Sequence, residues 1–200
     1  MTIKPQLLLL PLFFAASAAT AQHAAHVHGE AQLTVAVGEN ALHIEFESPG
    51  ANLVGFEHAP QNQQQVQALK LASKNLAAPS NLLRFRGTVC RLQDVDVEAP
   101  YAEAAPQHAH HAHEDDHGRH SEHSNHTEHS HDAEHSHHSE HASFRASYIY
   151  RCDNLSGLDG IDVRLFARFP DIHKIQAQWL TATKQGAVRL TSKSPTLQLK

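Results

Sequence analysis

The 200-residue sequence has few sulfur-containing side chains and no long hydrophobic run beyond its first residues. Its only cysteines, Cys90 and Cys152, lack the close C-x-x-C spacing usual in thiolate zinc sites. Its single methionine is Met1, so the rest of the chain lacks thioether ligands for Cu(I). Because no hydrophobic segment follows the one in its first residues, the rest of the chain is not expected to insert into a membrane.

Clustered positive charge is also missing. The formal net charge is −5 and the lysines and arginines are scattered, which argues against a nucleic-acid partner. The sequence contains no H-E-x-x-H, no G-x-S-x-G elbow and no Gly-rich phosphate-binding loop. We therefore do not expect this protein to be an enzyme.

The first residues have the pattern of a secretory signal peptide. Lys4 precedes an apolar run from Leu7 to Ala16, and Ala19-Thr20-Ala21 provides a small-x-small cleavage site. Residues 1–21 are thus predicted to be removed on export. Because exported proteins meet an oxidising environment, Cys90 and Cys152 are predicted to form a disulfide, with paired thiolate ligands as the alternative.

A histidine-rich and acidic segment interrupts the chain at about residues 100–141. Between His108 and His141 it holds fourteen of the twenty histidines, eight Asp or Glu residues and one basic residue, Arg119. It contains no Leu, Ile, Val, Phe or Trp, so we predict a long disordered loop. Neutral imidazoles bind zinc, nickel and copper, so this loop is a candidate metal binder, with a solvated spacer as the alternative. Its predicted ligands are His108, His110, His111, His113, His117, His120, His123, His126, His129, His131, His135, His137, His138 and His141.

Hydrophobic periodicity outside this segment predicts one α+β domain, mainly antiparallel sheet with one or two helices. The domain would be built from two parts, residues 22–99 and 142–200, with the loop 100–141 between them. Residues 157–169 suit either a helix or a strand. The two cysteine-bearing strands are expected to be antiparallel neighbours, with a bulge near Asp94. The predicted elements are a hairpin (31–37 and 42–47), a helix (61–76), strands over 84–97 and 144–152, and a terminal hairpin (172–183 and 187–191).

A second, structured metal site is predicted from histidines close to the strands. His26 and His28 lie two residues apart and would face the same way in an extended segment. Loops carry the other candidates, which are Glu57, His58 and His173, and His23 lies further toward the N-terminus. Convergence of three or four would give a nitrogen-rich zinc site. The alternatives are a frayed terminus for His23, helix packing for His58, and a surface position for His173.

These motifs together resemble the ZrgA-type periplasmic zinc-uptake proteins. The resemblance rests on HVHG before the first strand, on ESPGANLVGFEHAP (47–60), on the His-rich insertion, on HASFRASYIYRC (141–152) and on LFARFPDIHKIQAQWL (165–180). It implies a soluble periplasmic zinc-binding protein that works with inner-membrane components of zinc import.

The function predicted on this basis is zinc capture and delivery, as by a metal chaperone. The loop would gather ions weakly and pass them to the structured site. The alternative is a His-rich buffer or detoxification protein for zinc, nickel or copper without a transport partner.

Overall fold

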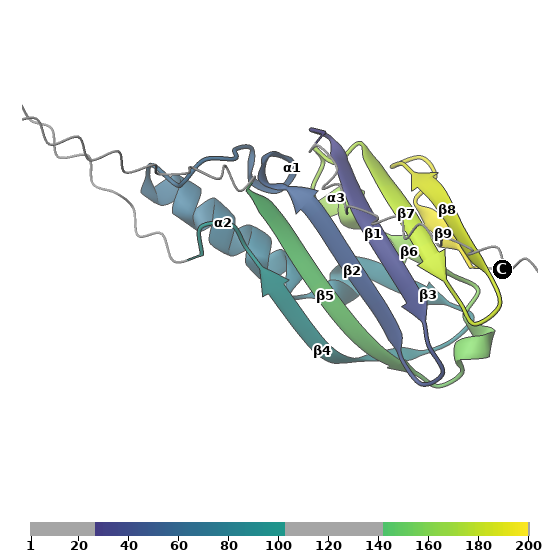
Figure 1. The fold of residues 1–200 in the computed structure, drawn as a ribbon. Coiled ribbons are helices and arrows are strands. Elements are labelled where there is room, and N and C mark those ends of the chain that lie inside the picture. Colours follow the sequence, from purple (N-terminus) through teal and green to yellow (C-terminus); the bar gives the residue numbers. More distant parts are fainter. Residues whose placement is uncertain (1–26, 103–141, 200) are drawn as a thin grey trace, which may run out of the picture.

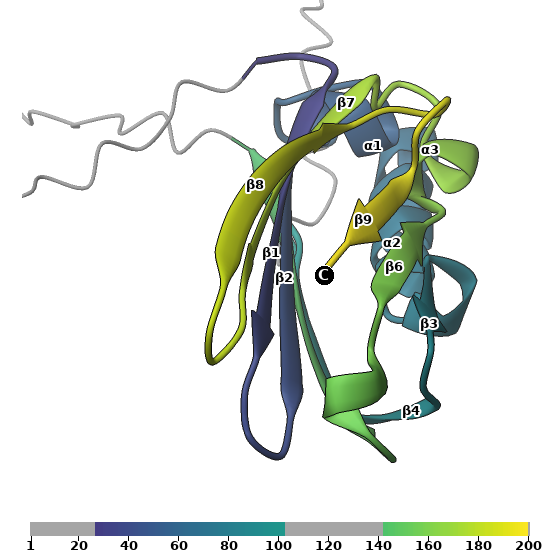
Figure 2. The ribbon, with the colours of Figure 1, turned by 90° about the vertical axis from the view of Figure 1, so that its right-hand side faces the viewer.

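A computed structural model describes residues 27–102 and 142–199. These residues form two layers, which Figures 1 and 2 show from the front and from the side. One layer is a six-stranded sheet, and the other combines a three-stranded sheet with helices. The prediction of a single, mainly antiparallel α+β domain is confirmed.

The six-stranded sheet has the strand order β4-β5-β2-β1-β7-β8. Its neighbouring strands are antiparallel except β1 and β7, which run parallel. The predicted N-terminal hairpin (β1 and β2) and terminal hairpin (β7 and β8) are both confirmed. The bounds are β1 Glu30–Val37, β2 Leu42–Pro49, β4 Cys90–Glu98, β5 Ser143–Cys152, β7 Lys174–Leu180 and β8 Gln185–Leu190.

The second layer covers one face of this sheet (Figure 2). Its three strands follow the order β3-β6-β9 and are antiparallel. The ambiguous stretch 157–169 contains both kinds of element, a short strand and then one helical turn. The bounds are β3 Leu83–Arg86, β6 Gly160–Val163, β9 Thr196–Gln198, α1 Gly50–Val54, α2 Gln63–Leu76 and α3 Leu165–Arg168, with 3-10 turns at Pro79–Asn81 and Leu155–Gly157.

Helix α2 begins two residues later than its hydrophobic pattern predicts. Asn62 occupies the N-cap, and its side-chain oxygen accepts a hydrogen bond of 2.9 Å from the backbone N–H of Gln65. Such a cap provides an acceptor for one of the backbone N–H groups of the first turn, which have no partner within the helix. The helix buries Leu69, Ala72 and Leu76 against the sheet. Within the described part of the chain, no helix is both long and apolar enough to cross a membrane.

The core lies between the two layers. Alternate residues of β1, β2 and β5 face it, as a period of two requires. Among its aromatic residues, Phe144, Phe166 and Phe169 are buried, whereas Phe85 and Trp179 are partly buried against the cluster. Burying one such side chain contributes about 1.5–3 kcal/mol.

The disulfide between Cys90 and Cys152 is present, as predicted. The two cysteines are direct partners in the antiparallel pairing of β4 with β5. The pairing shifts register between Leu92 and Asp94, which confirms the expected bulge. The bridge therefore joins the two strands between which the His-rich segment is inserted.

The strand directions bring several chain segments to one end of the six-stranded sheet, here called the binding end. Strands β1, β5 and β7 begin at this end, and β2 and β4 finish there. The segments just beyond those strand ends therefore lie close together (Figure 1). They include four of the predicted site residues, His28, Glu57, His58 and His173.

Candidate metal site

His28 and Glu57 form the central pair at the binding end. The Nε2 atom of His28 lies 3.4 Å from the Oε2 atom of Glu57. The His28 side chain is 71% exposed and that of Glu57 28% exposed, so solvent reaches the imidazole while the carboxylate is largely enclosed. The second oxygen of Glu57, Oε1, is buried and has no hydrogen-bond partner among the described residues. A buried anionic oxygen without a donor is a group to which a cation would be attracted.

Asn52 fixes the turn that carries His28. Its side-chain oxygen accepts a bond of 2.6 Å from the N–H of Gly29, and its amide nitrogen donates to the carbonyl of Glu30 at 2.9 Å. The same amide also donates to the hydroxyl of Ser48 at 3.1 Å. Asn52 and Ser48 are both buried, so these bonds satisfy polar groups removed from water. Sequence reasoning missed this role, although both residues lie in the ESPGAN motif.

His173 packs against the residue that follows His28. The backbone N–H of His173 donates to the backbone carbonyl of Gly29 at 2.8 Å. Gly29 has φ +81°, and a Cβ placed there would lie 2.8 Å from Nδ1 of the His173 ring. Both the left-handed backbone and the close approach of the ring therefore favour glycine at this position. The structure thus places His173 beside the turn of His28, although His173 itself is exposed, in keeping with the surface alternative.

His58 follows Glu57 in the chain, and its ring stacks on Phe56 with centroids 5.1 Å apart. The Nδ1 atom of His58 lies 2.8 Å from the carbonyl oxygen of Ala59. A carbonyl only accepts, so Nδ1 carries the hydrogen in this contact. In the neutral ring Nε2 then keeps its lone pair, which is the arrangement seen in metal-binding histidines with an outer hydrogen bond.

The residues on either side of 103–141 bond to two segments at the binding end, the loop that carries Glu57 and the start of α1. On the N-terminal side, the hydroxyl of Tyr101 donates to the backbone carbonyl of Glu57 at 3.0 Å. On the C-terminal side, the carbonyl of Ala142 accepts a bond of 2.6 Å from the N–H of Gly50. The residues that flank 103–141 are therefore fixed at the binding end.

An ion pair joins β1 and β7 at the same end. Lys174 Nζ lies 2.6 Å from Glu30 Oε1, and the two residues are partners in the parallel pairing. The hydrogen bond from Lys174 lowers the pKa of the Glu30 carboxyl below its ordinary value. Glu30 is thus charged and already paired, which leaves Glu57 as the carboxylate beside His28.

The structure brings together only part of the predicted ligand set. In the ranges 27–102 and 142–199, no three His, Cys, Asp or Glu side chains are grouped closely enough to hold a metal ion. His23, His26 and the fourteen histidines of the loop lie outside the described residues. His43 is exposed on β2, as expected for the solvated face of the strand.

The fold is thus an α+β scaffold with a histidine–carboxylate pair, His28 and Glu57, at one end of its sheet. The chain matches the family described as ZrgA family zinc uptake protein over residues 25–199. It belongs to this family, a zinc uptake family and not one of enzymes, and the resemblance drawn from its motifs is confirmed. None of the curated proteins matches the chain.

Proposed function

We propose that this protein captures zinc in the periplasm and delivers it to an import system of the inner membrane. Residues 1–21 direct export and are removed, and the mature chain carries zinc as cargo. Residues 22–99 and 142–200 form the domain, and 100–141 form a flexible metal-collecting loop. Membership of a zinc uptake family supports zinc as the ion.

The observation that carries the proposal is the separation of 3.4 Å between His28 Nε2 and Glu57 Oε2. In tetrahedral zinc sites both nitrogen and carboxylate oxygen lie about 2.0–2.2 Å from the metal, so two ligands are about 3.3 Å apart. The pair is therefore spaced as two corners of such a site. In this proposal His28 and Glu57 are the first two ligands of one tight site.

Further ligands come from histidines that precede or flank the pair. His26 lies two residues before His28 and would reach the same ion from an extended segment. His173 beside Gly29, His58 beside Glu57, and His23 are the other candidates for the remaining positions. Water completes the coordination where fewer than four protein ligands bind.

The attachment of the loop at the binding end supports transfer of zinc from the loop to the tight site. Tyr101 bonds to the carbonyl of Glu57, and Ala142 bonds to Gly50 at the start of α1. A tethered ligand experiences an effective concentration set by the length of its linker, so ions held weakly by the loop meet the tight site often. Transfer between imidazoles then proceeds by ligand exchange, without release to bulk solvent.

The test compares the mature protein, residues 22–200, with a variant in which a short Gly/Ser linker replaces residues 108–141. Each protein is titrated with zinc against a competing chromophoric chelator. We expect the shortened protein to lose several weak sites and to keep one tight site. Loss of all zinc binding would instead favour the buffer function, in which the loop alone holds the metal.

Matched histidine variants of the shortened protein identify the tight site. His28→Ala should weaken zinc binding by at least an order of magnitude, because zinc loses a direct ligand. His43→Ala is the control, since His43 is an exposed histidine on the neighbouring β2. Equal zinc affinities in the two variants would rule out His28 as a ligand.

A further inference from the structure

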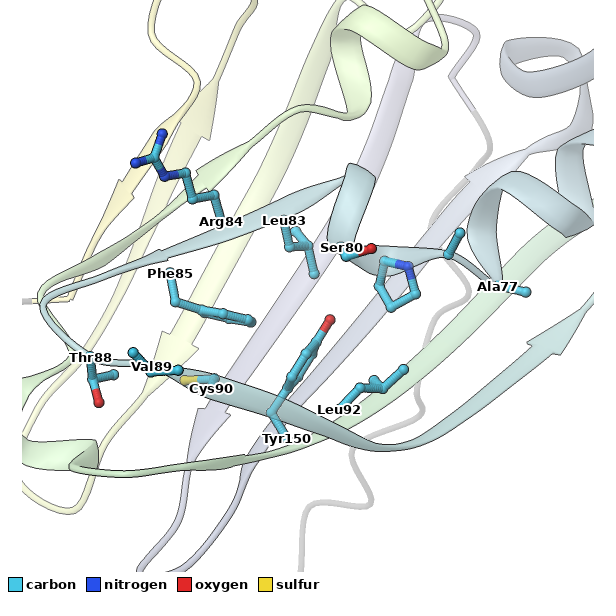
Figure 3. A pocket seen from close by; sticks show the side chains of 12 residues that line it. Ala77, Ser80, Leu83, Arg84, Phe85, Thr88, Val89, Cys90, Leu92 and Tyr150 are labelled. Carbon is cyan, nitrogen blue, oxygen red and sulfur yellow. The ribbon is translucent and has the colours of Figure 1, made fainter.

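A concave surface lies between the two layers, where β3 and β4 separate into different sheets. It encloses a volume of about 550 Å³ and is bounded by the residues after α2, by β3, by the first half of β4 and by Tyr150 of β5 (Figure 3). A volume of this size lies within the range of about 300–1,000 Å³ found for small-molecule sites. Neither His28 nor Glu57 lines this pocket.

The hydroxyl of Tyr150 is the unusual feature of this pocket. Tyr150 is 4% exposed, and its hydroxyl is buried without a hydrogen-bond partner among the described residues. Figure 3 shows the hydroxyl directed toward Leu83 and Ser80, into the space that the lining residues surround. By contrast, the buried hydroxyl of Tyr148 donates to the carbonyl of Leu76 at 2.9 Å. A buried hydroxyl without a partner is costly, so a group that bonds to it would be favoured there.

The other walls are mostly apolar. Phe85 packs edge-on against Tyr150, with ring centroids 4.6 Å apart. Val89 and Leu92 at the rim are 60% and 39% exposed, which leaves apolar surface open to an incoming molecule. Arg84 is the one charged residue of the lining, and in Figure 3 its guanidinium points away from Phe85 and Tyr150.

The chemistry of these walls selects a class of ligand. A charged molecule would lose its hydration without gaining a counter-charge inside the pocket. Burial raises the pKa of the Tyr150 hydroxyl to about 12, so this group is a neutral donor and acceptor at physiological pH. A complementary ligand is therefore uncharged and apolar apart from one hydrogen-bonding group.

We propose that this pocket binds a small, uncharged, apolar molecule through one hydrogen bond to the hydroxyl of Tyr150. The pocket contacts the N-terminal part of β4, at Cys90 and Leu92, whereas the binding end lies beyond Glu98. Occupation of the pocket is thus separate from zinc binding and does not depend on the proposed function.

The test uses 4-methylphenol as the probe and toluene as its partner without a hydroxyl. Each is titrated into the mature protein while the amide resonances of Leu83, Phe85 and Leu92 are followed by NMR. Both probes should produce saturable shifts. Tyr150→Phe should weaken 4-methylphenol binding about fivefold and leave toluene binding unchanged, as expected for loss of one neutral hydrogen bond.

Tyr148→Phe provides the matched control, because it removes a neighbouring hydroxyl that is already bonded. It should leave the affinities of both probes unchanged. The proposal is overturned if neither probe gives a saturable shift in the unmodified protein, in which case the pocket holds water only. It is equally overturned if Tyr150→Phe and the unmodified protein bind 4-methylphenol with the same affinity.

Discussion

The Nε2 atom of His28 lies 3.4 Å from the Oε2 atom of Glu57, and the two residues lie on opposite sides of the β1–β2 hairpin in the sequence. The sheet holds the segments of both residues at the same end, so the pair is assembled by the fold. The buried Glu57 Oε1 has no donor in the described part of the chain. These two facts make Glu57 the first residue to test.

Replacement of Glu57 by Gln should weaken the tight zinc site of the shortened protein about 10- to 100-fold. The amide removes the negative charge beside His28 while keeping nearly the same shape, and changes of this kind at metal sites have effects of that size. Zinc affinity is measured by competition with a chromophoric chelator. Glu45→Gln, an exposed carboxylate on β2, is the control and should change the affinity less than twofold. Equal effects of the two variants would show a general electrostatic contribution and no ligand role for Glu57.

Tyr101 offers a test of how the loop is attached. Its backbone has φ 57°, a left-handed conformation that is unfavourable for a residue with a side chain, and its hydroxyl bonds to the carbonyl of Glu57. Tyr101→Phe should remove this bond at a cost of about 1 kcal/mol and loosen the Glu57 segment. Amide hydrogen exchange near Glu57 should accelerate about fivefold, with no comparable change in β1 or β2. Unchanged exchange would mean that other contacts fix the loop.

Two glycines with nearly the same φ separate backbone strain from contact with His173. Gly29 and Gly55 have φ +81° and +84°, but a Cβ on Gly29 would meet the His173 ring, whereas one on Gly55 would meet nothing within 4 Å. Gly55→Ala should therefore lower the free energy of unfolding by about 1–2 kcal/mol, the cost of a left-handed residue. Gly29→Ala should cost more, because the ring must also move.

Urea unfolding gives the stabilities of both glycine variants, and the chelator assay gives their zinc affinities. If His173 is a zinc ligand, Gly29→Ala should also weaken zinc binding, while Gly55→Ala should not. Normal zinc affinity in a folded Gly29→Ala protein would remove His173 from the ligand set.

The sequence predicted the strands well because their signals are local, and it predicted the disulfide because the sequence contains two cysteines. Leu42, Ile44 and Phe46 alternate with polar residues, and a period of two leaves little choice of element. Cys90 and Cys152 could be paired because they are the two cysteines of a chain expected to be exported to an oxidising environment. The parallel pairing of β1 with β7 and the short strand β9 were not predicted, since both depend on contacts between distant parts of the chain.

The site was predictable by residue type but not by arrangement. His28, Glu57 and His173 were chosen because imidazole and carboxylate bind metals, and the fold does bring their segments to one end of the sheet. Asn52, whose amide fixes the His28 turn, carried no metal-binding signal and was missed. Its role follows from burial and from long-range hydrogen bonds, which a single sequence does not contain.

Two neighbouring tyrosines of β5 should respond oppositely to loss of their hydroxyls. Tyr148 donates a buried hydrogen bond to the carbonyl of Leu76 at the end of α2, so Tyr148→Phe should destabilise the protein by about 1–3 kcal/mol. Tyr150 has no such bond, and Tyr150→Phe should leave stability unchanged or raise it slightly. Urea unfolding of the two variants, read by the fluorescence of Trp179, measures the difference. A comparable loss in Tyr150→Phe would reveal a bonded partner for its hydroxyl, such as an ordered water.

The disulfide should stabilise the domain without contributing to zinc binding. Cys90 and Cys152 are 62 residues apart, and in the chain-entropy model a cross-link of this length contributes about 4 kcal/mol. The double variant Cys90→Ser/Cys152→Ser should lose about that amount in urea unfolding, because its unfolded chain is no longer constrained. The cysteines begin β4 and finish β5, away from the binding end, so protein that remains folded should keep its zinc affinity. A fall in zinc affinity under conditions where the variant is fully folded would show that the bridge also holds the site in place.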